Sequence, residues 1–217
     1  MVPSRQKKSL LPWYIAIAAL SLAVGVWLGT WNQAPQGPVS FDGGVMLPPK
    51  GLPALQLTDH DGEPFTNTRL MDRWTVVFFG YTYCPDICPT TLQLFTQVRE
   101  ELAQKPGGLD NVTFVFQSVD PARDTPERLK EYVTYFHPSF LGVTGEPQAI
   151  ETYARAVGAV YLRVRGDGRD ENNYLVDHSS AVFLMGPDGR MHGVFTAPHD
   201  PVNVAAGLLR FKEERGS

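Results

Sequence analysis

Both cysteines of this 217-residue chain lie in one short segment, Tyr81-Thr-Tyr-Cys84-Pro-Asp-Ile-Cys88-Pro89. The segment follows the apolar run Trp74–Gly80, which predicts a buried strand, and a helical pattern starts at Pro89. Functional sites of α/β sheets lie at such carboxyl ends of strands. If the helix begins between the cysteines, both sulfurs lie on one face and the helix N-terminus favours the thiolate. We therefore expect reactive or metal-binding thiols.

Two structural interpretations of the cysteines are less favoured. A disulfide closing so short a loop would stabilise the fold by only about 2 kcal/mol, and a domain of about 160 residues does not need it. Two inert buried thiols are the other alternative, and the position in a loop argues against it.

Two thiolates form an incomplete metal site, and a histidine is the natural addition. His178, in Tyr174-Leu-Val-Asp177-His178-Ser-Ser180, stands directly before a predicted core strand. From the residues alone, a structural role for His178 is as plausible as a ligand role. The other histidines are expected to be ordinary surface or capping residues: His60, His137, His192 and His199. Two sulfurs suit Cu(I), and an added nitrogen also permits Cu(II), whereas zinc held by Cys2His and water is a less favoured alternative.

The elements that must position these residues alternate along the chain. Strands are predicted over Trp74–Gly80 and Asn111–Val119, with a hairpin formed by Ser180–Met185 and Arg190–Phe195 around Gly186-Pro-Asp-Gly189. Helices are predicted from Pro89 to the stop Pro106-Gly-Gly108, from Pro126 with Thr125 as N-cap, over Pro147–Val157 and over Asp200–Phe211. The order β-α-β-α-(α)-β-β-α predicts an α/β sandwich with a mixed sheet. The polar stretch Asp167–Asn173 is interpreted as a mobile surface loop.

The N-terminal segment has the pattern of a membrane anchor. Arg5, Lys7 and Lys8 precede an uncharged run, and Leu10–Trp31 would rise about 33 Å as a helix. We therefore predict a cytoplasmic tail over residues 1–9, one transmembrane helix over 10–31, a Pro/Gly-rich tether over 32–54 and a folded domain over 55–215. The orientation places that domain in the periplasm, at a bacterial inner membrane. A cleaved signal peptide is the less favoured alternative.

The net charge of −4 provides no basic excess for phosphates, so no nucleic-acid partner is expected.

At the cysteine and histidine motifs the chain resembles the SCO/SenC copper chaperones, from about Leu55 to Arg210. The matching stretches are Tyr83-Cys-Pro-Asp-Ile-Cys-Pro89, Ser118-Val-Asp-Pro-Ala-Arg-Asp-Thr-Pro126, Leu141-Gly-Val-Thr-Gly145, Val176-Asp-His-Ser179 and Gly186-Pro-Asp-Gly189. The resemblance implies a thioredoxin-like mixed sheet flanked by helices, with the His178 loop over the helix N-terminus that carries the cysteines. It implies that Cys84, Cys88 and His178 bind copper, as Cu(I) and Cu(II). Asp86 is assigned no ligand role, and Asp120 is expected to orient loop backbone.

The resemblance also implies partners and a function. The copper acceptor would be the dinuclear copper centre of cytochrome c oxidase subunit II, with another periplasmic copper chaperone and a thioredoxin-like reductase as further partners. Such a chaperone is no enzyme. The main alternative is a thiol-disulfide oxidoreductase in which Cys84 and Cys88 are redox-active and reduce the acceptor's cysteines, although its usual spacing is Cys-x-x-Cys. A thiol peroxidase and a redox or copper sensor are weaker alternatives.

Overall fold

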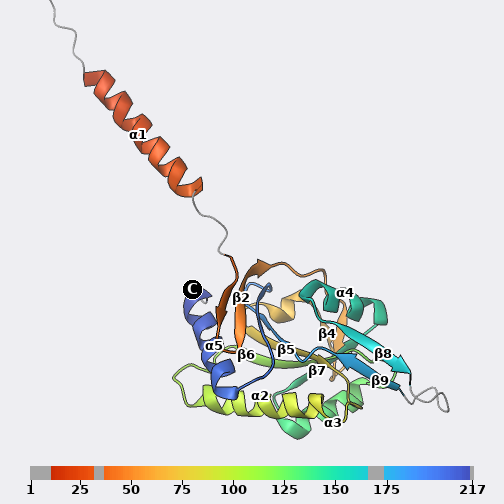
Figure 1. Ribbon diagram of the computed structural model, residues 1–217. Coiled ribbons are helices and arrows are strands. Elements are labelled where there is room, and N and C mark those ends of the chain that lie inside the picture. Colours follow the sequence, from red (N-terminus) through yellow and green to blue (C-terminus); the bar gives the residue numbers. More distant parts are fainter. Residues whose placement is uncertain (1–10, 32–36, 166–173, 216–217) are drawn as a thin grey trace, which may run out of the picture. The chain divides into compact units, whose positions relative to one another are not determined.

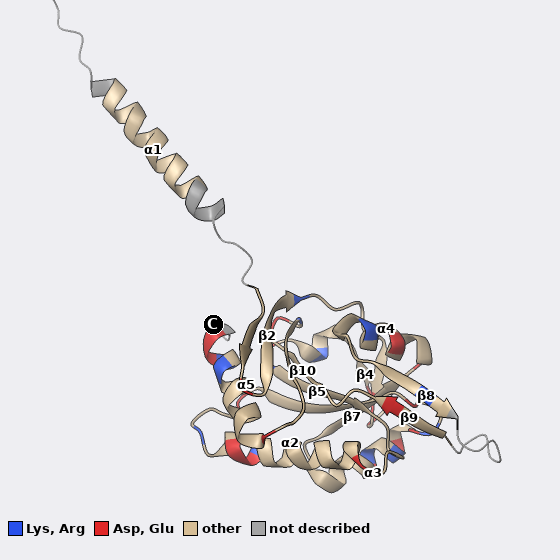
Figure 2. Ribbon diagram, viewed as in Figure 1, with Lys and Arg blue, Asp and Glu red and all other residues tan. Residues whose placement is uncertain are grey.

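The computed structural model describes residues 11–31, 37–165 and 174–215, in two compact units that divide after Gly37 (Figure 1). In the first unit, α1 (Leu11–Trp31) confirms a helix where the sequence predicts one, and it contains no charged residue (Figure 2). Among the described residues, however, no helix combines the length and the apolar character needed to cross a membrane. The transmembrane anchor over 10–31 stays a prediction, and the tail over 1–9 lies outside the described residues.

The second unit is built on one large mixed sheet with the order β1-β2-β11-β10-β5-β6-β7-β3-β4. Its strands are β1 (Val39–Phe41), β2 (Gly44–Lys50), β3 (Leu57–Asp59), β4 (Pro64–Phe65), β5 (Trp74–Gly80), β6 (Val112–Ser118), β7 (Leu141–Gly145), β10 (Val182–Met185) and β11 (Met191–Phe195). The pairs β5–β6 and β6–β7 are parallel, whereas β10 pairs antiparallel with β5. All seven residues of β5 are buried, as its continuous apolar run predicts for a central strand.

Helices cover both faces of this sheet: α2 (Ile87–Ala103) and α3 (Pro126–Phe136) run along one face and α4 (Pro147–Val157) lies on the other (Figure 1). The last helix, α5 (Pro201–Arg215), packs against α2, and a 3-10 turn, η1, spans Asn67–Leu70. The predicted apolar stripe of α2 is buried, and Thr125 caps α3 by accepting a hydrogen bond from the Arg128 backbone N–H at 3.3 Å.

Two segments correct the predicted organisation. The tether over 32–54 is wrong for 39–50, because β1 and β2 extend the sheet through antiparallel pairing of β2 with β11. Met46 is buried there, and Pro48-Pro49 lies between the paired residues Met46 and Lys50, opposite the register shift of β11, a type of position at which strands tolerate proline. The predicted order also lacked β7, a short strand inside the sheet that contains two glycines, Gly142 and Gly145.

A separate two-stranded sheet consists of β8 (Tyr161–Arg165) and β9 (Tyr174–His178), paired from Tyr161 opposite His178 to Arg165 opposite Tyr174. Neither strand belongs to the nine-stranded sheet. The predicted loop Asp167–Asn173 between them lies outside the described residues.

Candidate metal centre

The strand–loop–helix unit from β5 to α2 positions both cysteines. Cys84 is partly buried in the loop after β5, and Cys88 is buried in the first turn of α2. The helix therefore begins between the two cysteines, at Ile87, two residues before the predicted start at Pro89. Gly80 ends β5, and a Cβ atom added there would lie 2.6 Å from the Cys88 sulfur. The absence of a side chain at this glycine therefore permits the helix to approach the strand so closely.

A buried carboxylate, Asp124, holds the start of the cysteine loop. It accepts hydrogen bonds from the Thr82 backbone N–H at 3.1 Å and from the Thr82 hydroxyl at 2.7 Å. The Ser118 hydroxyl, at the end of β6, donates to the same carboxylate at 2.6 Å. Burial raises the pKa of Asp124, although these three donors oppose the shift. The loop is thus tied to the carboxyl end of the neighbouring strand.

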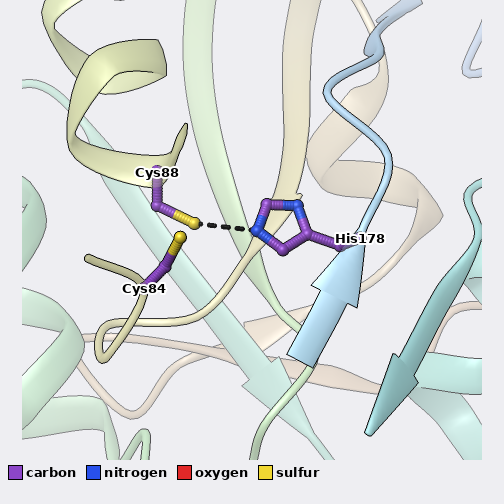
Figure 3. Close-up of side chains that lie close together, drawn as sticks. All are labelled: Cys84, Cys88 and His178. Carbon is purple, nitrogen blue, oxygen red and sulfur yellow. Dashed lines mark hydrogen bonds between the residues drawn. The ribbon is translucent and has the colours of Figure 1, made fainter. Parts of the chain in front are cut away.

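His178 reaches the cysteines from β9, where it is the last residue of the strand, not a loop residue as predicted (Figure 3). Its ring makes T-shaped contacts with the rings of Phe78 and Tyr81, with centroid distances of 5.4 and 5.8 Å. Nδ1 lies 3.3 Å from the Ser179 carbonyl, which can only accept, so a neutral ring making this bond carries its proton on Nδ1. The lone pair of Nε2 then points toward the cysteines, 3.2 Å from the Cys88 sulfur.

The two sulfurs and the imidazole nitrogen form a compact donor set. All three atoms lie within 4.8 Å of one another, and both thiols are free. Metal–sulfur and metal–nitrogen bonds of about 2.0–2.3 Å place three donors around one ion roughly 4 Å apart, so these residues fit a metal with little rearrangement. The structure therefore brings together all three predicted site residues. Asp86 is exposed and is not part of this cluster.

The two thiols differ in acidity. A hydrogen bond from the Cys88 thiol, together with the backbone N–H groups of Asp86 and Cys88, lowers the pKa of Cys84 to about 3, although burial opposes this shift. Burial is also the main cause that raises the pKa of Cys88 far above its ordinary value. The lowered pKa of Cys84 agrees in direction with the thiolate that the sequence predicts, but its largest cause is the Cys88 thiol and not the helix N-terminus; the pKa of Cys88 shifts in the opposite direction to the prediction.

Two of the other four histidines are not the surface or capping residues that the sequence predicts. His60 and His192 are buried; Nδ1 of His60 accepts from the Gly142 N–H at 3.0 Å, and Nε2 of His192 lies 2.8 Å from Asp188 Oδ1. Both fill polar positions in the core, which their turn and hairpin contexts did not indicate. The remaining two are partly buried: His137 follows the last turn of α3, and His199 bonds the Ser180 carbonyl.

Asp120 has a different role from the backbone-orienting one predicted. Its fully buried carboxylate accepts hydrogen bonds from Arg123 Nε and the Tyr174 hydroxyl, both at 2.5 Å. Arg123 and Tyr174 were not singled out from the sequence. Asp120 and Arg123 stand three residues apart directly after the carboxyl end of a predicted strand, and that position was the available signal.

The SCO1/SenC family model matches residues 49–213 of the chain. The chain belongs to the SCO1/SenC family. It is 36% identical over 156 residues to Protein SCO1 homolog 1, mitochondrial, of Arabidopsis thaliana. The aligned region covers 72% of this chain and 45% of that protein. The chain thus spans about half the length of this relative.

Solved structures of family members agree with the fold. The crystal structure of Arabidopsis thaliana ScoI with copper bound has a TM-score of 0.69 and 34% identity, covering 75% of this chain and 98% of that one. The structure of Bradyrhizobium japonicum ScoI with copper bound has a TM-score of 0.65 and 34% identity, covering 74% and 99%. The predicted thioredoxin-like mixed sheet flanked by helices is therefore confirmed.

Proposed function

We propose that this protein is a copper chaperone that binds copper through Cys84, Cys88 and His178. The observation that carries the proposal is the donor set itself, two free thiols and one imidazole nitrogen within 4.8 Å. Two sulfurs provide the soft ligands that select Cu(I), and the nitrogen adds a donor that Cu(II) prefers. The copper bound in two similar structures supports the same metal.

We further propose that the acceptor is the dinuclear copper centre of cytochrome c oxidase subunit II. Membership of the SCO1/SenC family supports this assignment. Copper would pass by exchange of ligands to an acceptor with similar soft donors, so no substrate bond breaks. Another periplasmic copper chaperone as donor and a thioredoxin-like reductase are the further partners in this proposal.

The test is titration of the reduced full-length protein with Cu(I) and with Cu(II). One equivalent of each ion should bind to the wild type, and the Cys84→Ser/Cys88→Ser variant should lose both. A wild-type protein that binds neither ion stoichiometrically would refute the chaperone function.

A thiol-disulfide oxidoreductase is the second candidate, favoured by the lowered pKa of Cys84 beside a second free thiol. The Cys84 thiolate would attack an acceptor disulfide and form a mixed disulfide. Cys88, after losing its proton, would then release the reduced acceptor and leave a Cys84–Cys88 disulfide, with two electrons transferred. A thioredoxin-like reductase would supply the electrons for the next cycle. Reduction of an acceptor disulfide by metal-free protein, lost in Cys84→Ser, distinguishes this function from copper transfer.

A further inference from the structure

The hairpin that carries His178 depends on side chains for its place in the fold. It pairs with neither edge of the nine-stranded sheet, and an isolated pair of strands is only marginally stable. Alternate residues of a strand face the same side, so Tyr174, Val176 and His178 share one face of β9. Tyr174 and Val176 are buried on the main unit, at 7% and 4% exposure. Whatever holds this face also orients His178.

Asp120, in the loop after β6, makes the central contacts between the hairpin and the main unit. Besides the bonds from Arg123 and the Tyr174 hydroxyl, it faces Arg163 of β8, whose Nη2 lies 3.5 Å from the carboxylate. The guanidinium of Arg163 also lies 4.2 Å from the centroid of the Tyr174 ring. Both strands of the hairpin therefore contact one buried anion, which is satisfied by two cations and a hydroxyl.

Asp120 and the side chains around it, Arg123, Tyr174 and Arg163, form what we call the hairpin anchor. Arg123 connects this hairpin anchor to the cysteine loop. Its guanidinium lies 3.6 Å from the centroid of the Tyr174 ring, and Nη1 donates to the Tyr174 carbonyl at 3.1 Å. The same guanidinium lies 4.8 Å from the centroid of Tyr83, the residue before Cys84. One planar cation thus contacts both the segment that carries Cys84 and the strand that carries His178.

We propose that Asp120 and Arg123 are positioning residues that fix His178 against the cysteines and thereby set how tightly the site holds Cu(II). This inference rests on the proposed copper function. Both cysteines belong to the segment formed by β5, the following loop and α2, and the nitrogen donor comes from the hairpin. Loosening the hairpin removes the nitrogen and leaves both sulfurs in place. Cu(II) should therefore weaken while Cu(I), which sulfur holds, changes little.

Two variants of the full-length protein test the hairpin anchor, one by a larger and one by a smaller change. Arg123→Lys keeps the charge but loses the planar stack and the forked donors, and Tyr174→Phe removes only the hydroxyl that bonds Asp120. Each should lower the Cu(II) affinity by about 10–100-fold, as outer partners of metal ligands do. The matched controls lie on α4: Arg155→Lys at an exposed site, and Tyr153→Phe, a buried ring whose hydroxyl has no hydrogen-bond partner among the described residues.

A second comparison separates positioning from general stability. In a His178→Ala background, Arg123→Lys should cause no further loss of Cu(II) affinity, because the ligand it positions is gone. If the losses add fully, or if Cu(I) affinity falls as much as that of Cu(II), the residues only stabilise the fold and the proposal is wrong. If Arg123→Lys fails to fold, the same comparison of Cu(II) affinities is made with Tyr174→Phe.

A metal-free measurement keeps this inference apart from the copper function. Nuclear Overhauser contacts between the His178 ring and the rings of Phe78 and Tyr81 should weaken in Arg123→Lys and persist in Arg155→Lys. If the wild type binds no copper, the proposed copper function is wrong, but these contacts still show whether Arg123 positions His178. Unchanged contacts together with unchanged Cu(II) affinity in both Arg123→Lys and Tyr174→Phe would overturn the proposal.

Discussion

The three donor residues differ in how far a substitution at each would disturb the core as well as the metal site. Cys88 is fully buried, Cys84 is partly buried, and His178 is held by a hairpin outside the main sheet. Removing His178 therefore perturbs the ligand set with the least effect on the core.

We expect His178→Ala to lower the Cu(II) affinity at least about tenfold, to change the visible charge-transfer spectrum and to leave Cu(I) bound by two sulfurs. Thermal unfolding and the Cu(II) spectrum should be measured on the same sample. His199→Ala is the control, because His199 is partly buried and its one hydrogen bond among the described residues is to a backbone carbonyl, whereas His192 is buried in the core. A lower melting temperature with an unchanged Cu(II) spectrum would show that His178 is structural.

The acidity of Cys84 predicts alkylation at low pH. With its pKa at about 3, Cys84 stays a thiolate at about pH 5, whereas an ordinary thiol is then less than roughly 0.1% ionised. Iodoacetamide should therefore label Cys84 but not Cys88 in the metal-free protein, and labelling should decline only as the pH falls toward 3. Mass spectrometry of peptides measures both sites.

Cys88→Ala is the matched control, because the Cys88 thiol makes the largest contribution to lowering the pKa of Cys84. Labelling of Cys84 at about pH 5 should slow in this variant. A labelling rate in the wild type that drops tenfold per pH unit from about pH 8 downward would instead indicate an ordinary thiol.

At the scale of elements, the close approach of β5 and α2 sets the place of Cys88. We expect Gly80→Ala to lower the free energy of unfolding by about 1–3 kcal/mol and to weaken copper binding, because the new methyl group would meet the Cys88 sulfur and the Phe116 ring. Chemical denaturation and copper titration measure the two effects.

Gly51→Ala serves as the control, since an added Cβ there meets nothing within 4 Å. If Gly80→Ala binds copper as tightly as the wild type, the strand–helix approach does not determine the site.

The elements also show where prediction from sequence works. β5 and α4 begin and end as their patterns predict. β5 is a continuous apolar run that ends at Gly80, and α4 has a helical apolar period that begins at Pro147 and is followed by Gly158. The edge strands β1 and β2 escaped prediction, because Pro48, Pro49 and several glycines resemble a linker when their pairing with β11 is unknown. β9 was not predicted for a different reason: its partner strand β8 is close in the sequence, but its buried face contacts Asp120 and Arg123 in a distant loop.

Prediction of the candidate site from the sequence used two kinds of information. The spacing of Cys84 and Cys88 at a strand-to-helix junction predicted reactive thiols by physical argument. His178 was undecided from the residues and was selected by the family resemblance, because its nearness to Cys88 arises from tertiary contacts across 90 positions. The unequal pKa values of the cysteines follow from their unequal burial, which spacing does not indicate.

At the scale of the molecule, we propose that α1 anchors the folded unit to a bacterial inner membrane with that unit in the periplasm. The uncharged sequence of α1 supports the proposal. Full-length protein should stay in the membrane pellet after a carbonate wash, and a variant without residues 1–37 should appear in the soluble fraction. N-terminal sequencing of the extracted protein should begin at or next to Met1. A soluble product that begins after Ala34 would contradict the anchor.

The separation of β8–β9 from the nine-stranded sheet implies that the metal centre spans two regions of unequal resistance to opening. β5 pairs with a strand on each side, β6 and β10, whereas β8 is the one strand that pairs with β9 in the part of the chain that the structure describes. Native-state hydrogen exchange should therefore find lower protection free energies for the amides of β9 than for those of β5. In that case the imidazole can swing away in a local fluctuation while both sulfurs stay in place. Equal protection in the two strands would mean that the nitrogen leaves only when the whole unit unfolds.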